Sequence, residues 1–503
     1  MSRITGHGAA FGATQATSRQ AATPLLTGLL RHAARRAVQF HIPGHKAGAG
    51  MDPELLGLLG PGVPSIDLIN IAPVDDLHRP TGIIKEAQEL AAEAFGADRT
   101  FFSVQGTSCA IMAMVLSTCG PGDKILVPRN VHKSVLAALV LSGARPVFMA
   151  PELDQELGVA HGVSLATVRS TLARHADAKA VFVVNPTYFG VCADLAGIVA
   201  EAHAYGIPVL VDEAHGVHCY FHDELPVSAM AAGADMAATS VHKLGGSLTQ
   251  SSILNVRGGL VNPDRVQAIL SMLTTTSTSY LLLASLDAAR RHLAIHGREL
   301  LDRTLRLARW ARSEINRIPG LLCLGRDVVG DRSSSFDLDE TKLCICVKGW
   351  GVTGIEVESI LRDEFNIEVE LSDLYNILCL ITLGDTEETV AHLVQALQAL
   401  AERFQAQGPA AAVRVRLPEL PELVLLPREA FYAPTEVVPL SESTGRVAAE
   451  SVMIYPPGIP ILMPGERISE GNLLYIREHI EAGLPVQGPE DPALQVIRVV
   501  RET

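Results

Sequence analysis

The segment MAATSVHKLGG, residues 236–246, joins a short apolar run to a lysine and two glycines. Residues 236–240 have the length and composition of a buried strand, and the two glycines are typical of a tight turn. Lys243 is therefore expected at the carboxyl end of a strand, which is where active sites lie in α/β sheets. Burial there would lower the pKa of the lysine and let it form a Schiff base with an aldehyde, although an isolated Ser-X-His-Lys motif more often marks an exposed turn.

Short apolar runs of the same kind recur along the chain and alternate with helical patterns. They cover residues 100–104, 124–128, 146–149, 180–184, 208–211 and 236–240. A helix is expected from Thr81, with Gly96 placed to end it. This alternation is typical of βαβ units, so the sequence predicts an α/β fold with a mostly parallel sheet and helices on both of its faces.

Two of these predicted strands are followed by polar groups that could serve the same site as Lys243. The strand before it ends in DEAHG, residues 212–216, and a carboxylate such as Asp212 can keep a pyridine nitrogen protonated. An Asp after an apolar strand can equally cap a helix or bind a metal. Another strand is followed by RNVHKS, residues 129–134, in which His132 could stack on a cofactor ring.

Hydroxyl-rich turns form a further signal, because they can bind a phosphate group. After the predicted strand 100–104 a helix is expected over residues 109–117, which places backbone N–H groups and hydroxyls at its positive end. Taken alone, each turn could also be an ordinary helix start. Four strands of one sheet each deliver a group that a phosphate-bearing aldehyde cofactor needs, so together they predict a single site. The phosphate-binding candidates are Gly106, Thr107, Ser108, Ser240 and His242.

The composition limits the class of protein. The chain has 503 residues, of which 48% are hydrophobic and 19% charged, enough for two or three domains. A formal net charge of −14 argues against nonspecific nucleic-acid binding and is compatible with a cationic substrate. The eight cysteines form no CxxC pair and are expected to be reduced and mostly buried, and no metal site is predicted. No apolar run of about 18 residues and no signal peptide are found, so we expect a cytoplasmic protein.

The chain is expected to form five successive regions. These are a disordered tail (1–22), an N-terminal segment (23–80), a large cofactor-binding domain (81–320), a small α+β domain (321–407) and a C-terminal segment (408–503). Two helices, 280–296 and 298–318, are predicted at the end of the large domain. For the small domain we expect strands 343–347, 368–371 and 377–381 and helices 354–365 and 386–404.

With these motifs the chain resembles the prokaryotic ornithine/lysine/arginine decarboxylase family, which has the aspartate-aminotransferase-like fold of type I pyridoxal-5′-phosphate (PLP) enzymes. The resemblance covers most of the chain. It rests on the motifs FHIPGHK (40–46), DDLH (75–78), GTS (106–108), NPTY (185–188), DEAHG (212–216), SVHK (240–243), YPPG (455–458) and PGE (464–466). One departure is Gln105, where the family usually has Asn.

The resemblance implies roles for individual residues. Lys243 would bind PLP, Asp212 would pair with its pyridine nitrogen, and His132 would stack on its ring, with His215 in the same site. Thr276 is expected to reach the phosphate from a second subunit. The residues implied to hold the phosphate or its surroundings are Gly106, Thr107, Ser108, Ser240 and His242.

The resemblance also implies the reaction, which is decarboxylation of a basic amino acid. We favour arginine, converted to agmatine in polyamine biosynthesis by a homodimer or higher oligomer with shared active sites, because no receiver-like domain is seen. Lysine or ornithine as substrate, an aminotransferase of the same fold, and a catalytically silent homologue remain alternatives. The candidates for binding the distal cation of the substrate are Glu370, Asp373 and Glu466, each of which could instead be a surface or capping carboxylate. We expect the charge of Glu466 to serve the substrate and not the fold.

Overall fold

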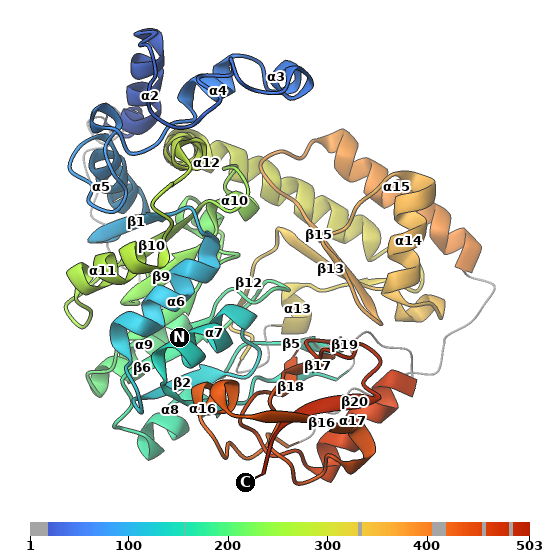
Figure 1. Cartoon of the computed structure of the whole chain (residues 1–503). Helices are drawn as coiled ribbons and strands as arrows, with labels where there is room; N and C mark the ends of the chain where they lie inside the picture. The colour runs from blue at the N-terminus through green and yellow to red at the C-terminus, as the bar shows by residue number, and fades with distance from the viewer. Residues whose placement is uncertain are drawn as a thin grey trace.

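A computed structural model describes residues 19–155, 157–329, 334–404, 419–454, 459–481 and 486–502. Three layered units follow one another along the chain, as Figure 1 shows from blue to red. A large unit is built around a seven-stranded sheet, a smaller unit around a four-stranded sheet, and the C-terminal part carries short two- and three-stranded sheets.

The central sheet has the strand order β1-β10-β9-β8-β6-β2-β3. Strands β9, β8, β6, β2 and β3 run parallel, as predicted, whereas β10 runs antiparallel between β1 and β9 and was not predicted. The bounds are β1 Arg99–Ser103, β2 Lys124–Pro128, β3 Arg145–Met149, β6 Ala180–Val184, β8 Val209–Asp212, β9 Met236–Thr239 and β10 Ser252–Val256.

Helices cover both faces of this sheet because its strands are apolar on both sides. Adjacent residues of one strand point to opposite faces, so Phe182 packs in the cluster of α6, α7 and α11, and Val181 packs in the cluster of α8 and α9. The helices of the large unit are α2 Pro24–Ala34, α3 Pro53–Leu59, α4 Gly62–Ile66, η1 Ala72–Val74, α5 Ile83–Phe95, α6 Gly106–Thr118, α7 Lys133–Ser142, α8 Leu165–Arg174, α9 Leu195–Ala204, η2 Val217–Tyr220, α10 Val241–Leu244 and α11 Pro263–Leu273. Short strands β4 Leu153–Asp154 and β5 Val159–Ala160 form a hairpin beside it.

A single helix, α12 (Tyr280–Ile315), leads from the large unit into the small one. Two helices with a break near Gly297 were predicted, and this was wrong. Gly297 lies buried inside the helix, where a Cβ would come within 2.9 Å of the Cβ of Phe221. The glycine therefore allows close packing against the large unit and does not end a helix.

The small unit has the strand order β11-β13-β15-β14, with α14 and α15 packed on it. The predicted elements are found within one to three residues of their expected positions. A further strand, β12, leaves this unit and pairs antiparallel with β7 of the large unit. The bounds are β7 Val191–Cys192, β11 Leu322–Cys323, α13 Arg326–Val329, β12 Asp337–Leu338, β13 Lys342–Cys346, η3 Lys348–Trp350, α14 Gly354–Phe365, β14 Leu371–Ser372, β15 Asn376–Leu380 and α15 Glu387–Phe404.

The C-terminal part packs around its own apolar cluster. Its elements are α16 Pro427–Tyr432, β16 Thr435–Pro439, η4 Leu440–Glu442, β17 Val452–Ile454, β18 Ile459–Leu462, α17 Glu470–Glu481, β19 Val486–Gln487 and β20 Val496–Val500. The YPPG motif at 455–458 lies outside the described residues.

Ordered structure begins before the predicted end of the N-terminal tail. Residues 1–18 lie outside the described part of the chain, but residues 19–22 are held by contacts. The buried guanidinium of Arg290 donates to the carbonyl oxygens of Gln20 and Ala22, each at 2.6 Å. A buried cation needs such acceptors, so this part of the tail is fixed by the fold.

All eight cysteines are free and buried, as expected. Within the described ranges, no helix is both long and apolar enough to cross a membrane. The same residues contain no cluster of three or more His, Cys, Asp or Glu side chains arranged to hold a metal ion.

Candidate active site

Lys243 and His215 meet at the carboxyl edge of the central sheet. Lys243 lies in α10, which follows β9, and His215 lies just after β8, its parallel neighbour. The Nζ of Lys243 is 2.8 Å from Nε2 of His215. Burial lowers the pKa of Lys243 below its ordinary value, although the nearby carboxylates of Asp212 and Glu370 oppose this. The structure therefore brings the predicted lysine into a site where its amine can lose a proton.

Asp212 is the last residue of β8 and is only 5% exposed. Its Oδ1 accepts a hydrogen bond of 3.1 Å from the backbone N–H of Ala214, and burial raises the pKa of Asp212 to about 6. Next to β8, Asn185 follows β6 and donates its backbone N–H to the carbonyl of Asp212. The amide nitrogen of the Asn185 side chain is buried without a hydrogen-bond partner. Such an orphan donor is the kind of group that a bound ligand would satisfy.

A cluster of hydroxyl groups lies at the start of α6. Gly106 has a positive φ of 76°, which lets the chain turn from β1 into the helix. The Oγ1 of Thr107 hydrogen-bonds the hydroxyls of Ser240 and Ser252, the latter at 2.7 Å. Ser252 starts β10 and was not predicted as a site residue because that strand itself was missed. The other predicted residues are also here, with Ser108 partly buried in the first turn of α6 and Nδ1 of His242 2.9 Å from the carbonyl oxygen of Ser251.

Two of the predicted cofactor contacts lie exposed in this chain. His132 caps α7, with its Nδ1 accepting from the backbone N–H of Ser134 at 3.2 Å, and the residue is exposed as a whole. Thr276 is exposed in the segment between α11 and α12. Its predicted role in the site of a second subunit stays a prediction.

A second lysine, Lys342, enters the site from the small unit and was missed by sequence reasoning. It is the first residue of β13, and its side chain is only 1% exposed. Its Nζ is 2.9 Å from Nδ1 of His215 and donates to the carbonyl oxygen of Tyr188 at 3.2 Å. Burial lowers the pKa of Lys342 to about 8. A Cβ on Gly190 would come within 2.9 Å of Cδ of Lys342, so the glycine leaves room for this side chain.

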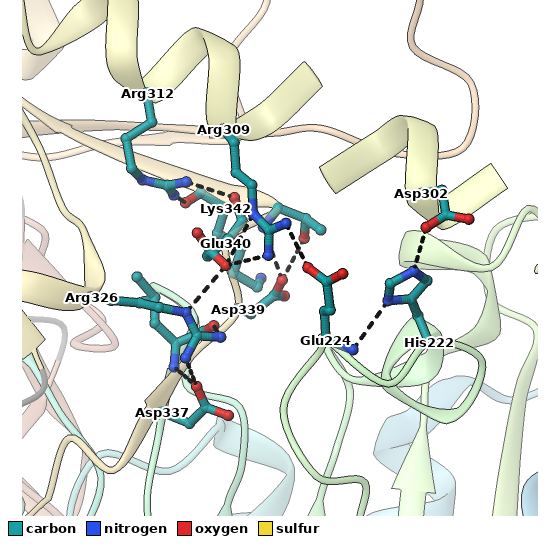
Figure 2. A network of polar contacts seen from close by, with 12 residues as sticks. His222, Glu224, Asp302, Arg309, Arg312, Arg326, Asp337, Asp339, Glu340 and Lys342 are labelled. Carbon is teal, nitrogen blue, oxygen red and sulfur yellow. Dashed lines mark hydrogen bonds and ion pairs between the residues drawn. The ribbon is translucent and has the colours of Figure 1, made fainter. Parts of the chain in front are cut away.

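The segment that carries Lys342 is held by arginines of α12 and α13. Figure 2 shows Arg309, Arg312 and Arg326 around residues 337–342. Arg312 donates to the carbonyl oxygen of Lys342 at 2.7 Å, and Arg309 joins Glu340 at 2.8 Å to Glu224 of the large unit at 2.6 Å. This network ties the backbone of the segment to α12 and to the large unit.

Asp339 lies in the same segment and points to η2. Its Oδ2 is 2.9 Å from Nε2 of His218, and its Oδ1 accepts from the hydroxyl of Thr341 at 2.7 Å. Burial alone would raise the pKa of Asp339, but His218, Lys342 and these hydrogen bonds lower it to about 2. Asp339 is therefore a buried negative charge close to Lys342.

The three carboxylates predicted to bind the substrate lie in different surroundings. Glu370 is exposed and accepts a hydrogen bond of 2.6 Å from the hydroxyl of Tyr188, whose ring centroid is 5.9 Å from Nζ of Lys243. Asp373 is buried and accepts from the backbone N–H groups of Tyr375 and Asn376, each at 2.8 Å. Glu370 thus reaches the site of Lys243, whereas Asp373 caps a turn between β14 and β15.

Glu466 is fully buried and binds Arg129, which follows β2. Arg129 contacts both carboxylate oxygens, one of them at 2.7 Å, and its Nε donates to the carbonyl of Pro460 at 2.8 Å. The backbone N–H of Met463 donates to the same carboxylate at 2.8 Å. The expectation that the charge of Glu466 serves the substrate and not the fold is therefore corrected, because a paired buried charge is part of the packing.

The residues at this sheet edge fit PLP. They supply an amine with a lowered pKa for the aldehyde, a buried carboxylate for the ring nitrogen, and an orphan amide donor at Asn185. The start of α6, with its hydroxyl cluster, is suited to a phosphate.

Two family models match this chain over most of its length. The model described as "Orn/Lys/Arg decarboxylase, major domain" matches residues 23–389, and the one described as "Orn/Lys/Arg decarboxylase, C-terminal domain" matches residues 411–484.

Similar proteins and structures agree with these models. An arginine decarboxylase from Bacillus subtilis (strain 168) is 62% identical over 481 residues, which cover 95% of this chain and 98% of that protein. An arginine decarboxylase from Bacillus anthracis is 60% identical over 481 residues, covering 95% of this chain and 97% of that protein. The crystal structure of a Francisella novicida lysine decarboxylase superposes with a TM-score of 0.83 at 23% identity, covering 96% of this chain and 82% of that one. This likeness confirms the predicted fold class.

Proposed function

Because this chain belongs to the Orn/Lys/Arg decarboxylase family, we propose that it is a PLP-dependent enzyme that removes the α-carboxylate of arginine and produces agmatine. The observation that carries the proposal is the contact between Lys243 and His215 at the sheet edge, beside the buried carboxylate of Asp212. The relatives named above support arginine in preference to lysine or ornithine, because they are about 60% identical over nearly the whole chain.

Each residue of the site has a defined task in this proposal. The amine of Lys243 would attach PLP, and Asp212 would hold a proton on its ring nitrogen. PLP supplies the electron sink for the charge left on the α-carbon when carbon dioxide departs. His132 would stack on the ring of the bound cofactor. The groups proposed to hold the phosphate are the N-terminus of α6 at Gly106, with Thr107, Ser108, Ser240 and His242.

Glu370 is the proposed partner for the distal cation of the substrate. It is hydrogen-bonded to Tyr188, whose ring lies near Lys243, and it is exposed in this chain. A guanidinium can bind a carboxylate with two parallel hydrogen bonds, which a lysine ammonium cannot reproduce. Glu466 and Asp373 are not proposed for this task, because their oxygens already have partners inside the fold.

Purified protein supplied with PLP tests the proposal directly. We expect an absorbance band from the lysine-bound cofactor and amine release from arginine that exceeds release from lysine and ornithine. Lys243→Ala should abolish both the band and the turnover, while Lys85→Ala, at an exposed lysine of α5, should change neither. Amine release by Lys243→Ala at the wild-type rate would contradict the proposal, and keto-acid formation without carbon dioxide would identify an aminotransferase.

The proposal includes three further predictions. A homodimer or higher oligomer with shared active sites, a role in polyamine biosynthesis and a cytoplasmic location stay predictions. Size measurement in solution checks the first of them.

A further inference from the structure

The imidazole of His215 lies between two lysines. Nζ of Lys243 is 2.8 Å from Nε2, and Nζ of Lys342 is 2.9 Å from Nδ1. The ring is only 5% exposed, and Lys342 is 1% exposed, so water does not separate the three groups. The ring of Tyr188 packs edge-on against His215, with its centroid 4.7 Å away.

The two short contacts limit the number of protons in this trio. A neutral imidazole has one N–H and one lone pair, whereas a lysine ammonium has three N–H donors and no lone pair. If both lysines were charged, both would have to donate to one available lone pair. One of the two amines must therefore be neutral and accept from the ring N–H, so the trio of Lys243, His215 and Lys342 holds at most one extra proton.

Each of the two lysines has carboxylates near it that favour a positive charge. Lys243 is balanced by Asp212 and Glu370, and Lys342 is balanced by Asp339. Burial, and after it the two lysine charges, lower the pKa of His215 well below its ordinary value, so the ring itself is neutral. The charged and titratable groups that face the trio are Asp212, Glu370, Asp339, His132, His218, His242 and Cys219.

We propose that Lys243 and Lys342 share one proton through His215, so that Lys342 takes up the proton that Lys243 must lose before its amine can react. The ammonium of Lys243 gives a proton to Nε2 of His215, and the N–H at Nδ1 of the same ring gives its proton to the neutral amine of Lys342. One N–H bond breaks at Lys243 and one forms at Lys342, while the ring changes tautomer and the total charge is unchanged. Lys342 is thus a positioning residue that acts on Lys243 through His215. The inference rests on the proposed function, because it concerns the amine that attaches PLP.

The reactivity of Lys243 in the full chain freed of PLP tests this inference. Acetic anhydride acetylates only neutral amines, and mass spectrometry reports the rate at each lysine as a function of pH. We expect Lys342→Met to raise the pKa of Lys243, because the variant lacks the amine that competes with Lys243 for the shared proton. Acetylation of Lys243 at pH 7 should then fall about tenfold for each unit by which the pKa rises. Lys85, an exposed lysine in the same chain, is the internal reference.

Lys342→Arg is the matched variant, because arginine keeps the positive charge but cannot accept a proton. In this variant Lys243 should be acetylated at pH 7 at least as fast as in the wild type. ¹⁵N solid-state NMR of histidine-labelled protein, assigned with His215→Gln, should show two exchanging tautomers of His215 in the wild type and only the Nε2–H form in Lys342→Arg. Thermal unfolding checks that each variant is folded.

Several outcomes would overturn the shared proton. Wild-type reactivity of Lys243 in folded Lys342→Met would do so, as would equal slowing in the Met and Arg variants, which would mean that Lys342 only fills space. A single tautomer of His215 in the wild type at every pH would exclude the transfer even if Lys342→Met failed to fold. Failure of the proposed function would look different, because PLP absorbance would be missing while the coupling of the two lysines persisted.

Discussion

Two buried sets of charged groups in this chain differ in whether each hydrogen-bond donor has an acceptor and each charge an opposite charge. In the pair of Arg129 and Glu466 a cation meets a carboxylate, and the backbone of the C-terminal part supplies further partners, including the carbonyl of Pro460 and the N–H of Met463. In the trio of Lys243, His215 and Lys342 two amines meet one imidazole, and neither amine touches a carboxylate within salt-bridge distance among the described residues.

The difference separates a structural contact from a functional one. Burying an ion pair costs desolvation energy, which the fold recovers only when every donor and acceptor is used, as at Glu466. The trio has more N–H donors than acceptors, and the pKa values of its two lysines are lowered toward neutrality, which is common among reactive groups. In this chain the pair of Arg129 and Glu466 therefore holds the C-terminal part to the large unit, whereas the trio lies where the cofactor is proposed to bind.

Among the residues of the candidate active site, Asp212→Asn should cause the largest loss of turnover. An amide cannot hold a proton on the ring nitrogen as a carboxylate does, so we expect turnover to fall by several orders of magnitude while PLP remains bound. Stopped-flow or steady-state rates together with cofactor absorbance provide the measurement. Near-wild-type turnover would place Asp212 with the structural residues.

In the buried ion pair of Arg129 and Glu466, Glu466→Gln should cause the largest loss of stability. It leaves the guanidinium of Arg129 buried without its counter-charge, so we expect the free energy of unfolding to fall by about 3–5 kcal/mol. Chemical denaturation measures this, and the activity per folded molecule should stay close to wild type. The double variant Arg129→Met with Glu466→Gln removes both charges and should recover part of the loss. A stability equal to wild type in the single variant would show that the pair contributes nothing.

Glu370 and Asp373 lie three residues apart, but we expect one to bind the substrate and the other to stabilise a turn. Glu370→Gln and Asp373→Asn test this difference. A hydrogen bond to a charged group contributes about 1.5–3 kcal/mol, so Glu370→Gln should lower kcat/KM for arginine about tenfold or more. Asp373→Asn should instead lower the thermal stability, because the carboxylate accepts two backbone N–H groups, and should leave kcat/KM unchanged. The reverse pattern would exchange the two assignments.

Asp339 should give the smallest effect, visible only as a dependence of stability on pH. Its pKa is about 2 in the folded chain against an ordinary value of 3.8, so its contribution is present above about pH 4 and is lost as the pH falls toward 2. The shift corresponds to about 2 kcal/mol. Urea unfolding of wild type and Asp339→Asn should therefore differ by that amount at pH 6 and converge in acid. A difference that persists at pH 2 would show that the charge is not its cause.

The sequence predicted the part of the site that lies on one sheet. Lys243, Asp212 and Thr107 each follow or end a strand with a clear apolar run, and parallel strands bring their carboxyl ends together. The strand Ser252–Val256 escaped notice because its serine and asparagine interrupt the apolar pattern, and its hydroxyl at Ser252 was missed with it.

Contacts between distant segments could not be predicted in the same way. Lys342 begins a strand of the small unit, and nothing in the local pattern shows that β12 pairs with β7 and carries the following segment to His215. Glu466 binds a residue 337 positions earlier in the chain, so its local Pro-Gly-Glu sequence gave no hint of its partner. Gly297 was misread because a glycine that permits close packing has the same letter as one that ends a helix.

The uninterrupted helix α12 has a mechanical consequence. Its 36 residues span about 54 Å, and it begins in the core of the large unit at Tyr280 and ends in that of the small unit at Ile315. Because the helix is packed into a core at each end, a hinge motion that separates the two units would require breaking the packing at one of these ends. The helix also carries Arg312, whose guanidinium donates to the carbonyl oxygen of Lys342, so it connects the core of the large unit to the backbone that positions the second lysine.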